Sequence, residues 1–320
     1  VKKAIIHQFS PDDTDLYLAD KFLNITPKIE EYLRKKIERV YSDEARTGIF
    51  EEDNPFLEMI SDDLLETSVA VANRWKEEFV VSENQKTNDL VFIQFSKEGV
   101  DHFAFLRIAL RETLTHLGGE VDNPIKLTQN NLPGFGTGAD EALVINLQSR
   151  KYHLIEKRIK YNGTFLNYFS ENLLQAQPKI SPKKSIKALE KTAQKIAESF
   201  NTDDFQFQSK VKSAIFNHIE EENKLSPEKL ADDLFDDNLT ARLSFIDQVK
   251  ETVPEPVTFE EIDASRQLKK FENQKLSLSN GIELIVPNNV YEDAESVEFI
   301  LNENGTYSIL IKNIEDIQSK

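Results

Sequence analysis

The sequence lacks cysteine altogether and contains one methionine and one tryptophan. The absence of cysteine excludes disulfide bonds, thiolate metal sites and a cysteine nucleophile within this chain. No apolar run approaches the roughly 18 residues of a membrane-spanning helix. The first residues, Val1 to Ile6, lead directly into a strand pattern. We therefore expect no membrane span and no signal peptide, which fits a cytoplasmic protein.

Glycine and proline are also scarce, with 10 and 11 residues in a chain of 320. This composition argues against a fibrous or low-complexity chain. Hydrophobic residues make up 39% of the sequence and include 21 phenylalanines, enough for a substantial core. The length allows two domains, or three.

Basic residues are outnumbered, 39 against 56 acidic ones, and the net charge is −17. The 46 residues from Arg150 to Lys195 reverse this balance, and we call them the basic stretch. They contain eleven basic residues and three acids, Glu156, Glu171 and Glu190. Such a segment can hold a polyanion while the rest of the surface repels it. The candidate binding residues are Arg150, Lys151, Lys157, Arg158, Lys160, Lys179, Lys183, Lys184, Lys187, Lys191 and Lys195.

The second half of this basic stretch has the pattern of an amphipathic helix. Lys184, Lys187, Lys191 and Lys195 follow helical spacing, and the apolar residues from Ile186 to Phe200 follow the same period on the opposite side. Ser181 is a candidate N-cap, with Pro182 at the first helical position. The lysines form either a binding face, with Lys151, Lys157, Arg158 and Lys160 on a strand upstream, or an ordinary solvated helix face.

The remaining patterns predict an α+β protein. Strands are expected at 4–9, 16–18, 90–95, 103–115, 142–147 and 152–159, as a mainly antiparallel sheet. Helices are expected after Thr26 and Asp63 and around 165–174, and residues 118–138 are expected to be irregular. Residues 181–252 are helical in pattern, and short strands with Asn-Gly turns follow. We predict an α+β domain at 1–178, a helical segment at 179–255 and a β-rich region at 256–320, which is separate or extends the first sheet.

No motif predicts catalysis. The segment Gly134 to Gly138 has neither the spacing of a phosphate-binding loop nor a following helix. The five histidines form no zinc-binding pair. Acidic clusters occur at turns and helix starts, where short acids cap backbone N–H groups, at Asp12-Asp13, Glu51-Glu52-Asp53, Asp62-Asp63 and Asp236-Asp237. The one acid-x-lysine sequence, Glu222 to Lys224, lies at a helix end. We therefore expect no cofactor, no metal site and no enzyme.

A resemblance to a known family is carried by the order of short segments. Arg39-Val40-Tyr41-Ser42, followed by Gly48-Ile49-Phe50, comes after an amphipathic helix and a strand that begins Ile5-Ile6-His7-Gln8. This order, over residues 1–180, resembles bacterial nucleoid-associated proteins of the NdpA type. The resemblance implies a cytoplasmic protein of the bacterial nucleoid without an enzymatic site, and makes Arg39, Tyr41, Gly48 and Phe50 signature residues. From the residues themselves we expect structural roles, with Gly48 ending a turn and Tyr41 and Phe50 packing against the first helix.

Three functions follow from the charge and the resemblance. The leading hypothesis is a non-enzymatic protein that contacts DNA weakly, in a salt-sensitive way and without reading sequence, through the basic residues of 150–195. The second is an acidic adaptor that reaches the nucleoid by binding a DNA-associated protein. The third is a hydrolase whose site is not recognisable. The sequence leaves the oligomeric state open, a homodimer included.

Overall fold

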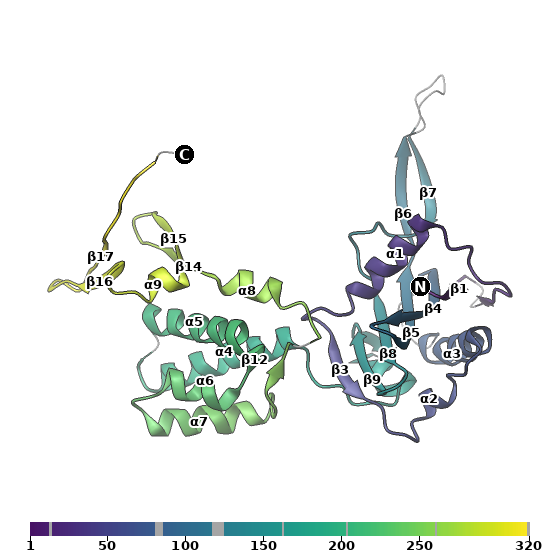
Figure 1. The fold of residues 1–320 in the computed structure, drawn as a ribbon, viewed down its shortest axis with the longest axis horizontal. Coiled ribbons are helices and arrows are strands. Elements are labelled where there is room, and N and C mark those ends of the chain that lie inside the picture. Colours follow the sequence, from purple (N-terminus) through teal and green to yellow (C-terminus); the bar gives the residue numbers. More distant parts are fainter. Residues whose placement is uncertain are drawn as a thin grey trace. The chain divides into compact units, whose positions relative to one another are not determined.

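The computed structural model describes residues 1–12, 15–80, 86–116, 125–161, 163–202, 204–259 and 261–318. They form two compact units, unit 1 from Val1 to Ser181 and unit 2 from Pro182 to Lys320, both drawn in Figure 1. The α+β class is confirmed by one antiparallel sheet, helices and C-terminal hairpins. In the described ranges, no helix is long and apolar enough to cross a membrane. The finer division at residues 178 and 255 stays a prediction.

Unit 1 is built on a seven-stranded antiparallel sheet with the order β2-β1-β4-β5-β8-β9-β3. The fourth strand in this order, β5, is central, as its apolar residues on both faces predict. The strands are β1 (Lys3–Ser10), β2 (Asp15–Tyr17), β3 (Arg46–Ile49), β4 (Asn88–Lys97), β5 (Val100–Ala109), β8 (Glu141–Asn146) and β9 (Lys151–Ile155).

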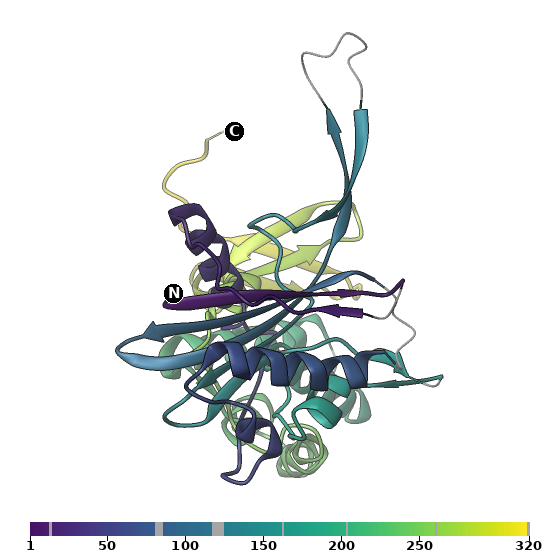
Figure 2. The same cartoon turned by 90° about the vertical axis from the view of Figure 1, so that its right-hand side faces the viewer.

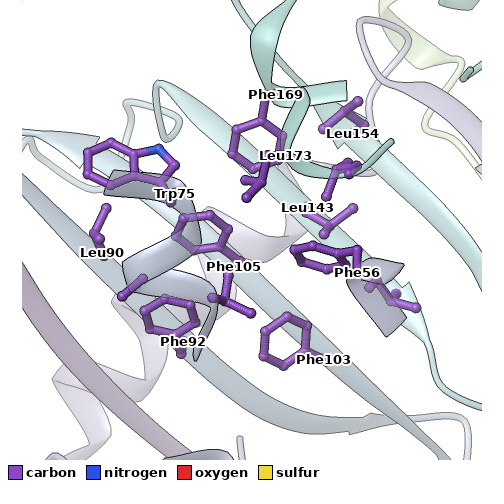
Figure 3. Packing of buried hydrophobic residues seen from close by; sticks show 14 of the residues in the cluster. Phe56, Trp75, Leu90, Phe92, Phe103, Phe105, Leu143, Leu154, Phe169 and Leu173 are labelled. Atoms are coloured by element: carbon purple, nitrogen blue, oxygen red, sulfur yellow. The ribbon is translucent and has the colours of Figure 1, made fainter. Parts of the chain in front are cut away.

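Both faces of this sheet are buried. Along β4, Leu90 and Phe92 join one hydrophobic cluster, and Val91 and Ile93 join another on the opposite face, as the alternation of strand side chains requires. Figure 3 shows the larger cluster, in which Trp75 and Phe56 lie near the phenylalanines of the sheet. A sheet covered on both faces explains why its central strands are continuously apolar.

Helices from different parts of unit 1 cover the two faces. The face with Phe92 carries α2 (Pro55–Glu58), α3 (Leu64–Phe79) and the π-helical turn η1 (Phe169–Leu173), and Figure 2 shows α3 lying along the sheet. The other face is covered by α1 (Pro27–Glu38), through Leu33 and Ile37. The Thr26 and Asp63 side chains cap α1 and α3 by accepting backbone N–H groups.

Two expected elements of unit 1 differ from the structure. The predicted strand 103–115 ends at Ala109, and β6 (Arg111–His116) leaves the sheet to pair with β7 (Ile125–Asn131), inside the segment expected to be irregular. The segment 165–174 is not a single helix, because β10 (Ile159–Tyr161) and β11 (Thr164–Leu166) form a small hairpin before η1. In both places two short strands pair with each other in a local hairpin. Residue periodicity alone does not show which strands pair.

Unit 2 combines a helical part with short hairpins. Its helices are α4 (Pro182–Ser199), α5 (Phe205–Glu222), α6 (Pro227–Leu234), α7 (Leu239–Lys250), α8 (Ser265–Phe271) and α9 (Asn288–Tyr291). The strands pair only with each other in the described structure, as β12 (Lys224–Leu225) with β13 (Val257–Thr258), β14 (Asn273–Ser277) with β15 (Glu283–Pro287), and β16 (Val297–Leu301) with β17 (Tyr307–Ile311). The C-terminal strands therefore do not extend the sheet of unit 1.

Candidate nucleic-acid interface

Helix α4 separates its lysines from its apolar residues as the sequence predicts. Ile186, Leu189, Ala193 and Ile196 are buried on one side. Lys184, Lys187, Lys191 and Lys195 are exposed on the other. At 1.5 Å per residue, the row of four lysines extends over roughly 16 Å. We call these four residues the lysine row.

Most of the lysine row has no acidic partner. Within the described residues, no carboxylate forms an ion pair with Lys184, Lys187 or Lys191. The Lys195 ammonium donates to the amide oxygen of Gln248 on α7, at 3.1 Å, so that lysine also keeps its charge. An uncompensated row of ammonium groups on a rigid helix favours a polyanion over a small ligand.

A neighbouring helix adds basic residues that the sequence reasoning missed. The ammonium of Lys270 on α8 lies 3.2 Å from the carboxylate of Glu190 on α4, although α8 packs mainly against α5. Exposed Arg266 and Lys269 belong to the same short helix. The sequence of α8 contains three basic residues and no acid, which could have marked it as basic. It lies about 70 residues after the lysine row, so nothing in the sequence connects the two.

The boundary between the two units falls inside the basic stretch. Six of the eleven candidates belong to unit 1, and Lys183 with the lysine row belongs to unit 2. In unit 1 the basic side chains come from different elements. Lys151 lies on β9 and Lys160 on β10, whereas Lys157 and Arg158 lie between these strands and not on one strand as expected.

Several basic side chains of unit 1 have intramolecular partners. Arg150 pairs with Glu52 at 3.1 Å, and Lys157 pairs with Asp140 at 2.8 Å. Arg158 donates to the carbonyl oxygen of Phe165 at 2.7 Å. The exposed Lys179 lies just before the unit boundary, and its backbone N–H donates to Thr47. These residues are therefore less available to a polyanion than the lysine row.

The signature residues have structural positions that differ in part from the expectation. Gly48 does not end a turn, because it lies within β3, opposite Tyr152 of β9. A Cβ atom there would come within 2.8 Å of the Tyr152 ring, so a larger residue fits only if that ring moves. The exposed side chain of Arg39 lies at the end of α1, and its Cδ would be 3.8 Å from a Cβ at Gly138.

The two signature aromatics are on opposite faces of the sheet. Phe50 is buried against Phe56 and Tyr152, on the face away from α1. The expectation that it packs against the first helix is therefore wrong, although it is a core residue. Tyr41 is half-buried and packs beside the α1 cluster, and its ring centroid lies 4.7 Å from that of His153.

The glycine-rich segment is organised around a cation and not around a phosphate. The ammonium of Lys36, on α1, donates to the carbonyl oxygens of Pro133, Gly134 and Thr137, with a distance of 2.9 Å to Gly134. A phosphate-binding loop presents backbone N–H groups to its ligand. Here the carbonyl groups converge on a buried lysine, and the segment is a support for α1.

The buried histidine of β1 is not poised as a general base. His7 Nδ1 accepts the backbone N–H of Ala19 at 3.0 Å, so the ring proton is on Nε2, which contacts Ser68 Oγ at 2.9 Å. The imidazole therefore donates to the serine and cannot take its proton in this tautomer. Burial lowers the pKa of His7 to about 4.

Several of the acids singled out in the sequence are helix caps or ion-pair partners. Asp63 caps α3, and Glu222 pairs with Lys229 at 2.5 Å. Asp236 pairs with Lys210 at 3.0 Å. Asp13 lies outside the described residues. Within the described ranges, no group of three or more acids or histidines is arranged to hold a metal ion.

Comparison with known proteins gives one family. Residues 5–317 match the model of a family described as nucleoid-associated protein YejK. No curated protein matches the chain. The match spans both units, including the lysine row and α8.

Proposed function

The chain belongs to the family of nucleoid-associated protein YejK, and on this premise we propose that it holds DNA directly, without reading sequence, through the lysine row of α4. The observation that carries the proposal is the exposure of four lysines on one side of a helix whose other side is packed into unit 2. Ammonium groups in such a row neutralise successive phosphates and release the counterions condensed on DNA.

The proposed contact is non-enzymatic and sequence-independent. Lysine side chains bind phosphates as flexible point charges, whereas base readout needs groups that enter a groove and pair with base edges. The large negative charge of the rest of the chain would orient DNA toward the row and keep binding weak. The unit 1 residues Arg150, Lys151, Lys157, Arg158, Lys160 and Lys179 are assigned a secondary role, because several have intramolecular partners.

A second candidate function is an adaptor that reaches the nucleoid through a protein partner. The β16–β17 hairpin favours it, because Leu301, Tyr307 and Ile311 on one face of this hairpin are 63%, 51% and 48% exposed. Exposed apolar surface of this kind marks protein-interaction sites. An adaptor would leave purified protein without affinity for DNA.

The test is a binding titration with random duplex DNA at low salt. The variant Lys184→Gln/Lys187→Gln/Lys191→Gln/Lys195→Gln removes the row. The matched control, Lys21→Gln/Lys28→Gln/Lys86→Gln/Lys275→Gln, makes the same change in net charge at exposed positions outside the basic stretch. We expect DNA binding by the wild type and the control, and a large loss for the row variant.

Three other results would contradict the proposal. Absence of binding by the wild type favours the adaptor. Equal losses for the row variant and the control show a general charge effect without a site. Degradation of DNA in the presence of Mg²⁺, in preparations that retain activity through further purification, would show a hydrolase.

A further inference from the structure

Strands β6 and β7 form an arm that leaves the sheet of unit 1. The two strands pair only with each other in the described structure, and the arm projects away from the sheet in Figures 1 and 2. All six residues of β6 are exposed. A two-stranded hairpin without a third layer is marginally stable in water. We therefore expect the arm to be stabilised by contact with a further surface.

The register of the arm separates two chemically different faces. Leu114 lies opposite Leu127, and His116 lies opposite Ile125, so these four side chains share one face. Leu114, Ile125 and Leu127 are 72%, 67% and 55% exposed. Glu112 completes this face near the sheet, where its carboxylate accepts from Gln129 at 3.1 Å.

The other face of the arm is polar. Thr113 and Thr128 lie opposite each other with their hydroxyl oxygens 3.0 Å apart, and Thr115 lies opposite Lys126. Arg111 is also on this face, at its base. The polar face needs no cover, whereas the apolar face exposes three large side chains to water.

We propose that the apolar face of the arm is a docking surface for the same face of a second copy of this chain. In a two-fold symmetric dimer both copies use the same surface, so the surface must be complementary to itself, as an apolar face is. The net charge of −17 opposes contact between the bodies of two copies, and an arm that projects from the sheet allows contact while keeping those bodies apart.

The polar side chains at the two ends of the apolar face fit this arrangement. A two-fold axis across the arm, at the Leu114–Leu127 pair, stacks the two ribbons antiparallel. It places Leu114 over Leu114 of the second copy, and Leu127 over Leu127. Because Glu112 and His116 lie two residues on either side of Leu114, the same axis places Glu112 of each copy over His116 of the other. A carboxylate then meets an imidazole, which can donate a hydrogen bond to it, at both ends of the leucine contact.

The absence of cysteine allows a direct test of which face is covered. Leu114→Cys places a thiol on the apolar face, and its neighbour Thr115→Cys places one on the polar face, because successive strand residues point to opposite sides. In such a pair the two ribbons lie roughly 10 Å apart, beyond the reach of a direct disulfide, so the full chain is treated with a short bismaleimide cross-linker. We expect a cross-linked dimer from Leu114→Cys and monomer from Thr115→Cys. Equal cross-linking of both variants, or of neither, would overturn the proposal.

Sedimentation equilibrium of the reduced proteins gives the energetic test. We expect a concentration-dependent dimer for the wild type, weakened at least about tenfold in Leu114→Ser/Leu127→Ser, which removes two buried leucines per copy. The matched control is Leu239→Ser/Leu243→Ser on α7, at residues 58% and 53% exposed. We expect that control to dimerise like the wild type. A wild-type monomer at concentrations on the order of 100 μM, or a dimer unaffected by the arm variant, would contradict the proposal.

Charge exchange tests the orientation of the two arms. Glu112→Lys should weaken the dimer, and the double variant Glu112→Lys/His116→Glu should restore it, since the acid and the base exchange places. Failure of this restoration would contradict the antiparallel arrangement. Loss of DNA binding by the arm variant without a change in oligomeric state would instead place nucleic acid on the arm, and would overturn the proposal.

Discussion

The carboxylate of Glu190 on α4 lies 3.2 Å from the ammonium of Lys270 on α8. Glu190 is one of two acids in α4, and this pair neutralises it at the edge of the lysine row. Arg266 and Lys269 belong to the same helix as Lys270, which packs mainly against α5. The other acid, Glu198, is exposed one turn beyond Lys195 and accepts from Gln194 at 3.2 Å, so negative charge remains at the C-terminal end of the row.

A first prediction concerns this acid. Glu190→Lys should raise the affinity for duplex DNA and steepen the dependence of log K on log salt by up to about 0.9, the value for one added phosphate contact. Fluorescence anisotropy across a salt series measures both quantities. Glu303→Lys, at an exposed position in the β16–β17 turn, changes the net charge equally and should change binding much less. Equal effects of the two variants would argue against a localised site.

A second prediction concerns Gly48 and Tyr152. Gly48→Ala should destabilise unit 1 by about 1–3 kcal/mol, because the added methyl group overlaps the Tyr152 ring and must displace it. Denaturant unfolding measures this cost. In a Tyr152→Leu background the same glycine substitution should cost clearly less, since the ring is gone. A Gly48→Ala variant as stable as the wild type would show that the ring moves freely.

A third prediction separates the two signature aromatics. Phe50→Ala should cost about 3–5 kcal/mol, because Phe50 is buried in the larger cluster. Tyr41→Ala should cost less, because Tyr41 is half-buried at the edge of the other cluster. Nucleoid association of the Phe50 variant would be lost through unfolding, visible as a lower melting temperature. Loss of association with an unchanged melting temperature would instead make this segment a docking surface.

A fourth prediction concerns the pH dependence of stability. Burial lowers the pKa of His7 to about 4, from 6.5 in the unfolded chain. Between these values the unfolded state binds more protons at this histidine, so the contribution of His7 to stability should rise with pH from about 4 to 6.5 and be constant above. His7 should contribute a loss of about 3 kcal/mol at pH 4. Unfolding of the wild type and His7→Gln at pH 5 and pH 7 checks this, because the variant should show a smaller difference between the two pH values.

Much of this fold could be predicted from periodicity. The opposed lysine and apolar sides of α4 and the apolar strand at Leu90 both follow from one short window of sequence. In contrast, β3 has four residues that include Gly48, and its strand conformation depends on pairing with β9, about one hundred residues later. The contact between Lys270 of α8 and Glu190 of α4 likewise depends on tertiary packing, so it could not be predicted from sequence.

The arm illustrates the same limit at the level of a surface. The alternation Ile125, Lys126, Leu127, Thr128 is a strand pattern, but the neighbouring glycines led to the expectation of irregular structure. The arm leaves the sheet because β5 ends at Ala109, and the sequence does not mark this end. The contrast between its two faces became clear from the register with β6.

The most direct measurement for the account is the salt dependence of DNA binding by the wild type, the lysine-row variant and its charge-matched control. Each phosphate contact that is lost should make the slope of log K against log salt shallower by about 0.9, up to roughly 3.6 for the four lysines together. The control should keep the wild-type slope. A lysine-row variant with the slope of the wild type would contradict the assignment of α4 as the DNA-binding element.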